Sequence, residues 1–91
     1  MADIQHAEVY FQGRVQGVGF RYAVFQVAKE FEVAGFVQNL TDGRVLVEAE
    51  ALPQELDGFV AAIQEKMDGY IRKVERANRL RTPQFSGFVI R

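Results

Sequence analysis

One glycine-containing segment that ends in an arginine has the residue types of a binding site. It reads Gly13-Arg14-Val15-Gln16-Gly17-Val18-Gly19-Phe20-Arg21. Glycines let a backbone turn sharply and let a ligand approach it closely, and successive N–H groups in such a loop can converge on an anion. The guanidinium of Arg21 can bind phosphate or carboxylate oxygens through two parallel hydrogen bonds. The segment therefore indicates an anion site, but a flexible turn with Arg21 on the surface would produce the same pattern.

The elements on either side of this segment are compatible with an anion site. Ala7, Val9 and Phe11 alternate with polar neighbours, which predicts a strand. From Phe20 onward apolar residues recur at helical spacing, which predicts a helix that ends before Gly35. The segment thus leads into a helix N-terminus, whose dipole attracts anions and disfavours the cation of Arg21 in the first turn. An anion bound in the loop would offset that cost. The glycine spacing differs from the dinucleotide fingerprint, and no Walker sequence follows.

Asn39 is the second candidate for a chemical role. It ends a predicted strand, residues 36–39, just before the turn formed by Thr41, Asp42 and Gly43. An amide side chain can hold a water molecule through both its donor and its acceptor. Asparagine is also common before turns for conformational reasons alone, so position by itself leaves both interpretations open. Thr41 is close enough in sequence to support Asn39.

The remaining elements complete a predicted fold class. A third strand covers residues 45–50, and a second helix begins at Pro53 and ends near Gly69. Weak alternation over residues 71–80 and a short run over residues 85–90 predict two more strands. The order β-α-β-β-α-β plus a short C-terminal strand predicts an α+β, ferredoxin-like split βαβ sandwich, with a mostly antiparallel sheet and two helices on one face.

Length and charge limit the classes of function. The chain has 91 residues, which predicts a single domain over residues 1–91. Its net charge is −1 and its pI is about 5.8, which argues against a nucleic-acid partner. Residues 1–70 hold 5 Lys or Arg and 11 Asp or Glu, whereas residues 71–91 hold 6 Lys or Arg and 1 Asp or Glu. We interpret the basic C-terminal segment as a solvated strand and hairpin rather than a binding face.

Other motifs are absent or carry little information. The chain has no cysteine, which excludes thiolate nucleophiles, and no apolar window long enough to span a membrane. No secretory signal is visible, so a cytoplasmic location is the default. His6 is the only histidine, and we expect it to be a solvent-exposed bystander outside any metal site. Tyr10-Phe11-Gln12-Gly13 looks like the remnant of a protease-cleavable tag. We reject this interpretation, because the segment lies within the alternating run and continues into the glycine-containing segment. We expect Met1 to Gln5 to be disordered.

The loop and the second strand together resemble the acylphosphatase family. The resemblance rests on the segment from Gly13 to Arg21, on Gly35-Phe36-Val37-Gln38-Asn39, and on the following Asp42-Gly43-Arg44-Val45 and Val47-Glu48-Ala49-Glu50. The separation between Arg21 and Asn39 also matches. The close match covers about residues 7–50, and the order of elements extends it along the chain.

The resemblance implies an activity and a set of site residues. Members of the family hydrolyse the carboxyl-phosphate bond of acyl phosphates to a carboxylate and inorganic phosphate, without a metal or another cofactor. By resemblance, Arg21 binds the phosphoryl oxygens and Asn39 orients the attacking water. The phosphate cradle is completed by backbone N–H groups of Val15, Gln16, Gly17, Val18, Gly19 and Phe20. The expected partners are small acyl phosphates and inorganic phosphate, and the expected state is a monomer.

Two alternatives remain at this point. The fold also serves RNA-binding and ligand-binding modules, but no Lys/Arg-Gly-Phe-type aromatic block of an RNA-recognition strand is present. A related domain occurs in larger hydrogenase-maturation proteins that handle carbamoyl phosphate, and a one-domain chain disfavours that role.

The roles of two tyrosines and one glycine stay open. Tyr22 and Tyr70 could line the site or cover the surface. Gly58 lies inside the second predicted helix, where glycine costs up to about 1 kcal/mol relative to alanine.

Overall fold

The computed structural model describes residues 4–91 and contains five strands and two helices within that range. In chain order they are β1 (Gln5–Gly13), α1 (Phe20–Ala28), β2 (Ala34–Asn39), β3 (Val45–Ala51), α2 (Pro53–Lys66), β4 (Ile71–Leu80) and β5 (Phe88–Ile90). This order is the predicted one.

The expected disorder at the N-terminus is wrong for Gln5. Gln5 begins β1 and pairs with Ala51 on one side and Leu80 on the other, so two ladders fix its backbone. Met1 to Asp3 lie outside the described residues.

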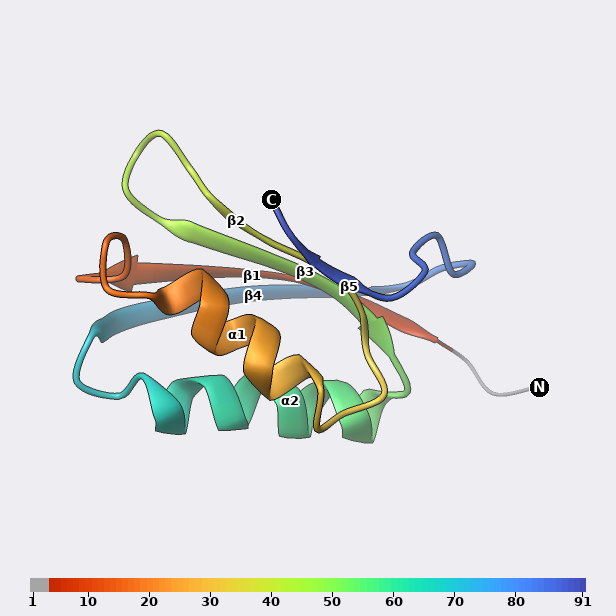
Figure 1. The fold of residues 1–91 in the computed structure, drawn as a ribbon. Coiled ribbons are helices and arrows are strands. Elements are labelled where there is room, and N and C mark those ends of the chain that lie inside the picture. The colour runs from red at the N-terminus through yellow and green to blue at the C-terminus, as the bar shows by residue number, and fades with distance from the viewer. Residues whose placement is uncertain (1–3) are drawn as a thin grey trace.

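The sheet has the strand order β4-β1-β3-β2-β5. Its pairs are antiparallel, except that β5 runs parallel to β2. β1 and β2 are joined through α1 and have β3 between them, which is the split βαβ arrangement. Both helices cover the same face of the sheet (Figure 1). The predicted ferredoxin-like α+β sandwich is therefore confirmed.

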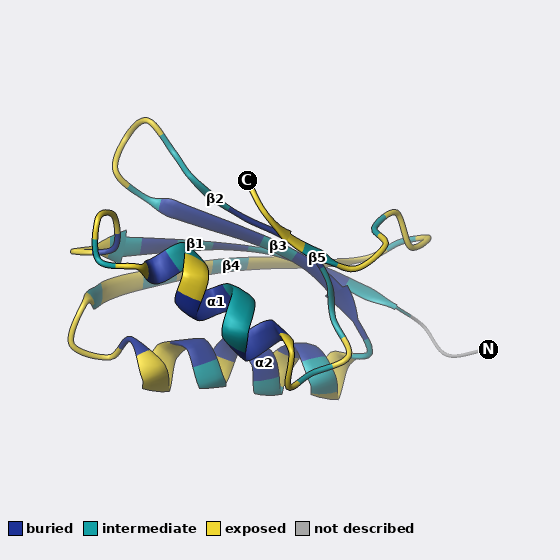
Figure 2. Ribbon diagram, in the orientation of Figure 1, coloured by how far each residue is buried: buried dark blue, intermediate teal, exposed yellow. Residues whose placement is uncertain are grey.

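The core lies between this face and the helices. Along β1 and β3 every second side chain points to the helices and is buried, which is the periodicity that the sequence shows. Phe20 and Val24 of α1 and Leu56 and Phe59 of α2 close the core from the other side. The buried stretches of strand and helix face one another in Figure 2. This packing fixes the start of α1 against the sheet.

Gly58 in α2 has a packing role. An added Cβ would lie 2.8 Å from Cε1 of Phe31, so the bare backbone makes room for that ring. Phe31 in turn packs against Phe59, with 6.2 Å between ring centroids. The contact explains why a poor helix former is tolerated in this helix.

The helix-free face of the sheet carries a polar cluster that the sequence did not reveal. His6 is fully buried there, so its expected exposure is wrong. The segment of residues 81–87 crosses this face, and the ring of Phe85 stacks on the imidazole, with 6.0 Å between centroids. β5 consequently starts at Phe88 and not at the expected residue 85.

Glu50 anchors that crossing segment. Its buried carboxylate accepts hydrogen bonds from the backbone N–H groups of Gln84 and Phe85 and from Arg81. Burial acts to raise the pKa of Glu50, but these donors outweigh it and hold the pKa below its usual value.

Glu50→Ala should lower the free energy of unfolding by about 2 kcal/mol, because the backbone N–H groups of Gln84 and Phe85 would lose their charged, buried acceptor. The melting temperature should fall by about 10 °C in a domain of this size. Urea unfolding would measure the first and calorimetry the second. Glu75→Ala, an exposed site on β4, is the control and should stay within about 0.5 kcal/mol. Equal stability of the two variants would show that Glu50 does not anchor the segment.

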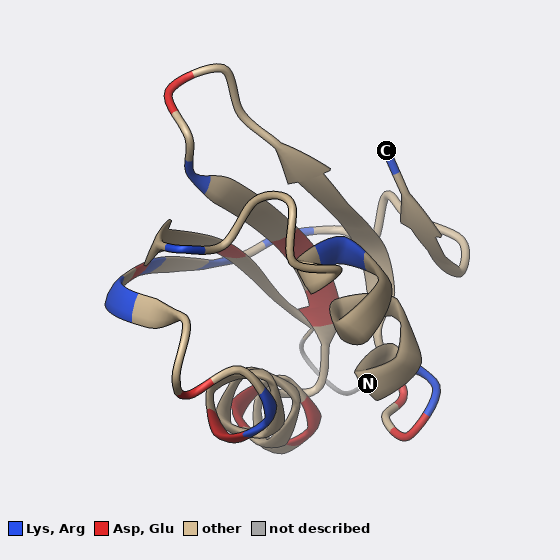
Figure 3. Cartoon of the chain, turned by 60° about the vertical axis from the view of Figure 1, so that its left-hand side comes forward, with Lys and Arg blue, Asp and Glu red and all other residues tan. Residues whose placement is uncertain are grey.

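Three of the six basic residues of the C-terminal segment pair with acidic residues elsewhere in the chain. Arg76 pairs with Asp57 of α2, Arg79 with Glu8 of β1, and Arg81 with Glu50 of β3. Basic and acidic residues are accordingly interspersed over the chain in Figure 3. Part of the uneven charge of the sequence is therefore balanced by ion pairs between segments. Among residues 4–91, no helix is long and apolar enough to cross a membrane.

Candidate active site

A cavity of about 220 Å³ lies where the loop after β1, the start of α1 and the end of β2 meet. It is smaller than the roughly 300–1,000 Å³ of drug-sized ligand pockets, so it suits one small group such as a phosphoryl group. Its lining residues are Val15, Gly17, Gly19, Phe20, Arg21, Tyr22, Asn39 and Ile90.

The loop owes its shape to two glycines. Gly17 has a φ of 77° and Gly19 a φ of 78°, both in the left-handed region that other residues rarely adopt. Open space surrounds both positions, so backbone conformation and not crowding requires glycine there. Residues that alternate between right- and left-handed conformations turn consecutive N–H groups toward one point. The loop can therefore present its N–H groups to an anion.

These N–H groups are free of other partners in the described structure. Within residues 4–91, no N–H of residues 15–20 donates a hydrogen bond to a backbone or side-chain acceptor. Gly19 caps α1 without a side-chain hydrogen bond, and the first turn of that helix holds no acidic residue. The unpaired N–H donors and the positive end of the helix dipole thus both favour an anion at this loop.

Arg21 supplies the full charge of the cavity. It is the only Lys, Arg, Asp or Glu among the lining residues. Its Nη1 donates a hydrogen bond of 2.9 Å to the backbone carbonyl of Arg91. Arg91 is itself fixed to β2, because its N–H donates to the carbonyl of Val37 and its guanidinium lies 3.8 Å from the ring centroid of Phe36. The arginine is therefore held at the cavity by β2 as well as by its own helix.

Asn39 enters the cavity from β2. It follows Val37 by two residues, so its side chain lies on the face that the helices cover. Its Oδ1 is buried and accepts no hydrogen bond from residues 4–91. A buried oxygen without a donor is uncommon and calls for an explanation, and a ligand in the cavity would supply one.

Gln16 links the two halves of the site. Its Nε2 donates to the carbonyl oxygens of Leu40 and Arg44, at 2.7 and 3.0 Å. These oxygens belong to the turn directly after Asn39, so the side chain ties the loop to the strand that carries the amide. Sequence reasoning assigned Gln16 only a backbone role, because nothing in the sequence shows which carbonyls would lie beside it.

Comparison with known proteins decides the family. The acylphosphatase family profile matches residues 7–90. The chain belongs to the acylphosphatase family. An acylphosphatase of Archaeoglobus fulgidus is 47% identical over 57 residues, which span 63% of this chain and 64% of that one.

Solved acylphosphatase structures share the whole architecture. The acylphosphatase of Bacillus subtilis superposes with a TM-score of 0.85 at 32% identity, covering 94% of this chain and 97% of that one. Full-length HypF in its phosphate- and nucleotide-bound form superposes with a TM-score of 0.82 at 25% identity. That match covers 99% of this chain but 12% of HypF, so HypF is a much longer protein that contains a similar domain.

Most of the predicted site residues of this acylphosphatase-family chain meet at the cavity. Six of them line it, namely Val15, Gly17, Gly19, Phe20, Arg21 and Asn39. Gln16 and Val18 belong to the loop but do not line the cavity, and Thr41 is exposed in the turn after β2. Tyr22 lines the cavity, whereas Tyr70 does not. Ile90 was missed, because only the β2–β5 pairing brings the end of the chain to α1.

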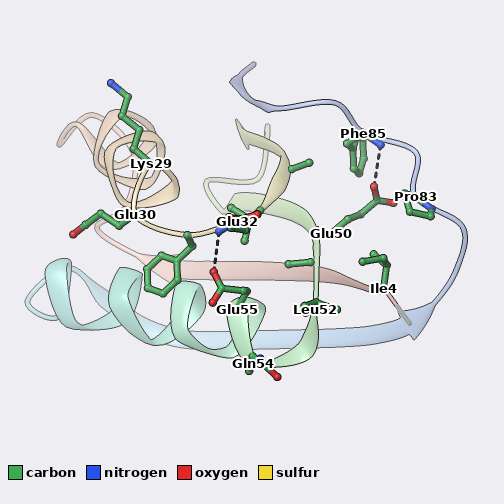
Figure 4. Close-up of a pocket in the computed structure, with 14 residues that line it drawn as sticks. Ile4, Lys29, Glu30, Glu32, Glu50, Leu52, Gln54, Glu55, Pro83 and Phe85 are labelled. Carbon is green, nitrogen blue, oxygen red and sulfur yellow. Dashed lines mark hydrogen bonds between the residues drawn. The ribbon is translucent and has the colours of Figure 1, made fainter. Parts of the chain in front are cut away.

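A larger hollow, of about 910 Å³, lies at the other end of the sheet. Figure 4 shows Glu50 beside Phe85 on one side of it and Glu32 beside Glu55 on the other. Glu30 adds a further carboxylate, and Lys29 is the only cation among its lining residues. This electrostatic environment repels anions, so the hollow is not the counterpart of the phosphate cradle.

Proposed function

We propose that this protein hydrolyses the carboxyl-phosphate bond of acyl phosphates, releasing a carboxylate and inorganic phosphate. The observation that carries the proposal is the cavity in which Arg21 and Asn39 meet a loop of unpaired N–H groups. Membership of the acylphosphatase family supports the same reaction class.

The loop and Arg21 bind the phosphoryl group in this proposal. Backbone N–H groups of residues 15–20 and the guanidinium surround its peripheral oxygens, where negative charge is spread in the transition state. The donors are already in place before substrate binds, so little reorganisation is needed when charge shifts during reaction. The acyl group extends out of the cavity past Tyr22, which is 62% exposed.

Asn39 positions the nucleophile in this proposal. Its unpaired Oδ1 accepts a hydrogen bond from a water molecule, which is thereby aimed at phosphorus. An amide cannot act as a base, so the contribution of Asn39 is orientation and not proton transfer. The proton of the attacking water passes to an oxygen of the phosphoryl group.

The leaving group explains why such a site needs no acid. The departing carboxylate belongs to an acid with a pKa of about 4, so it leaves without being protonated. The cavity lining contains no His, Asp or Glu that could serve as an acid or base. A phosphate ester of an alcohol, whose leaving group needs a proton, would fit these residues poorly.

Benzoyl phosphate provides the direct test. The native chain should release benzoate from it at neutral pH, at an unchanged rate when a chelator is added. Inorganic phosphate should inhibit competitively, because it would bind the same cradle. A folded protein that releases no benzoate above the spontaneous rate would refute the proposed activity.

Carbamoyl phosphate is the second candidate substrate, because the sequence also resembles the related domain of larger hydrogenase-maturation proteins. It carries the same carboxyl-phosphate bond on a smaller acyl group. A kcat/KM for carbamoyl phosphate above that for benzoyl phosphate would assign this chain to that chemistry.

Gln16→Leu should lower kcat/KM for benzoyl phosphate by about 10-fold or more, because small displacements of catalytic groups are costly. The substitution removes two hydrogen bonds to the turn after Asn39 but keeps the volume of the side chain. Gln12→Leu on β1, whose amide bonds to exposed Glu75, is the matched control. If both variants turn over like the native chain, Gln16 does not position Asn39.

The proposal extends to the oligomeric state, location, cofactors and partners of the enzyme. We propose a monomer that works in the cytoplasm on small acyl phosphates, without a catalytic metal or another cofactor and without a nucleic-acid or membrane partner. The ion pairs that neutralise residues 76–81 support the exclusion of nucleic acid. Light scattering at increasing concentration would test the monomer.

A further inference from the structure

Four polar side chains form a compact group on the helix-free face, at the end of the sheet away from the cavity. His6 and Glu8 alternate on β1, and in the ladder with β3 they lie opposite Glu50 and Glu48, respectively. All four therefore project to the same face, in two adjacent cross-strand pairs.

The imidazole of His6 is enclosed but lacks hydrogen bonds. It is fully buried, and neither ring nitrogen has a hydrogen-bond partner among residues 4–91. Nε2 lies 3.1 Å from Oε1 of Glu48, and Nδ1 lies 3.8 Å from Oε2 of Glu50. A buried imidazole with carboxylates at these distances, yet without well-directed hydrogen bonds, points to a further partner between the groups.

The carboxylates give the second indication. Glu8 and Glu48 are like charges placed directly opposite each other, which destabilises a strand pair. Arg79 pairs with Oε1 of Glu8, and the hydroxyl of Tyr10 donates weakly to Oε2 at 3.4 Å. Among residues 4–91, no arginine or lysine forms an ion pair with Glu48, and the nearby Arg81 is bound to Glu50. The group thus holds more negative charge near the imidazole than its arginines balance.

We propose that His6, Glu8 and Glu48 bind a divalent transition-metal ion, with Zn²⁺ as the preferred ion. One ligand atom from each lies within 4.8 Å of the other two. Ligand atoms around a tetrahedral Zn²⁺ are about 3.4 Å apart, given metal–ligand distances of 2.0–2.2 Å, so small rotations of the two glutamates complete the site. Imidazole and carboxylate together are typical Zn²⁺ ligands.

The surroundings fit a metal ligand set. The side chains of Glu48 and Glu8 are 22% and 25% exposed, which leaves the ion a route from solvent and a position for water. Glu50 faces Nδ1 of the imidazole, on the side away from Nε2 and Glu48, as outer carboxylates do in many metal sites. Arg79 holds Oε1 of Glu8, so the ion would bind Oε2, which within residues 4–91 accepts only the weak hydrogen bond from Tyr10.

The ion would have a structural effect. It would tie β1 to β3 beneath Phe85, on the opposite face and at the opposite end from Arg21 and Asn39. Binding should therefore stabilise the fold and leave hydrolysis unchanged, so this inference does not rest on the proposed function.

Zn²⁺ titration of the full chain tests the site. Equilibrium dialysis should give one bound Zn²⁺ per chain. At a free concentration about 100 times the Kd, the melting temperature should rise by about 10 °C or more. Co²⁺ in its place should give a visible absorption band. Because His6 is the only histidine, its ¹⁵N resonances report the site directly, and the Nε2 signal should move on binding.

Glu48→Gln keeps the shape of the site and removes one ligand charge, so it should lose the Co²⁺ band and the thermal shift. Glu75 is an exposed carboxylate of β4 on the same helix-free face of the sheet. Glu75→Gln should therefore keep both the Co²⁺ band and the thermal shift. Circular dichroism would verify that the variants are folded. Zn²⁺ binding that Glu48→Gln leaves intact would overturn the proposal. An Nε2 signal of the native chain that does not move when Zn²⁺ is added would also overturn it. The imidazole would then be a protonated partner of Glu48 and Glu50 and not a metal ligand.

Discussion

Arg21→Gln is expected to lower kcat/KM for benzoyl phosphate by about 10³-fold, the scale seen when a guanidinium is removed from phosphoryl transfer. Glutamine keeps part of the reach of the side chain but carries no charge, and Arg21 is the only charged residue lining the cavity. The loss should fall on binding as well as turnover, so inhibition by inorganic phosphate should weaken in parallel.

The control for this variant is the neighbouring arginine of the loop. Arg14 is exposed and does not line the cavity, so Arg14→Gln should retain nearly native kinetics. Arg21 also donates to the carbonyl of Arg91, so thermal unfolding must show that the variant keeps its fold. A folded Arg21→Gln protein that still binds phosphate and turns over normally would remove Arg21 from the cradle.

Asn39→Ala is expected to reduce kcat by about 10²- to 10³-fold, the cost of losing one well-placed polar group that orients a reactant. In contrast to Arg21→Gln, this variant should keep its affinity for inorganic phosphate, because in the proposed mechanism the amide contacts the water and not the phosphoryl oxygens. Steady-state kinetics with phosphate as inhibitor would separate the two effects.

Gln38→Ala is the matched control for Asn39, because the two residues are adjacent on β2 and project to opposite faces. It should change kcat little. If Asn39→Ala weakened phosphate binding and kcat by the same factor, Asn39 would contact the phosphoryl group, and the water would need another partner.

The order of elements could be predicted because each helix and strand has its own local pattern of apolar residues. The change from alternation in β1 to helical spacing after Phe20 marks the strand, the loop and the helix, and burial follows the same periods. Arg21 and Asn39 became candidates because a glycine loop before a helix and an amide at a strand end are short-range patterns, but their proposed roles came from the family resemblance.

What the sequence did not reveal depends on neighbours far away in the chain. His6 is buried only because residues 81–87 fold back over β1, and Phe36 packs on the helix-free face against Phe85 and Arg91. Alternation in β4 is weak because that edge strand is mostly exposed. The partners of Gln16 and of Arg21 lie 24 to 28 and 70 residues away, beyond the reach of any local pattern.

The strand order also has a kinetic consequence. β2 and β3 are the only neighbours in the described sheet that follow each other in the chain, so every other strand pair requires a long loop to close. Topologies dominated by distant pairings fold slowly, and a nine-residue helix such as α1 is unstable by itself. Arg21 meets Asn39 only when α1 is docked on the sheet, and it reaches its partner Arg91 only when β5 is paired with β2. In a refolding experiment, recovery of hydrolysis would therefore report that these long-range contacts have formed.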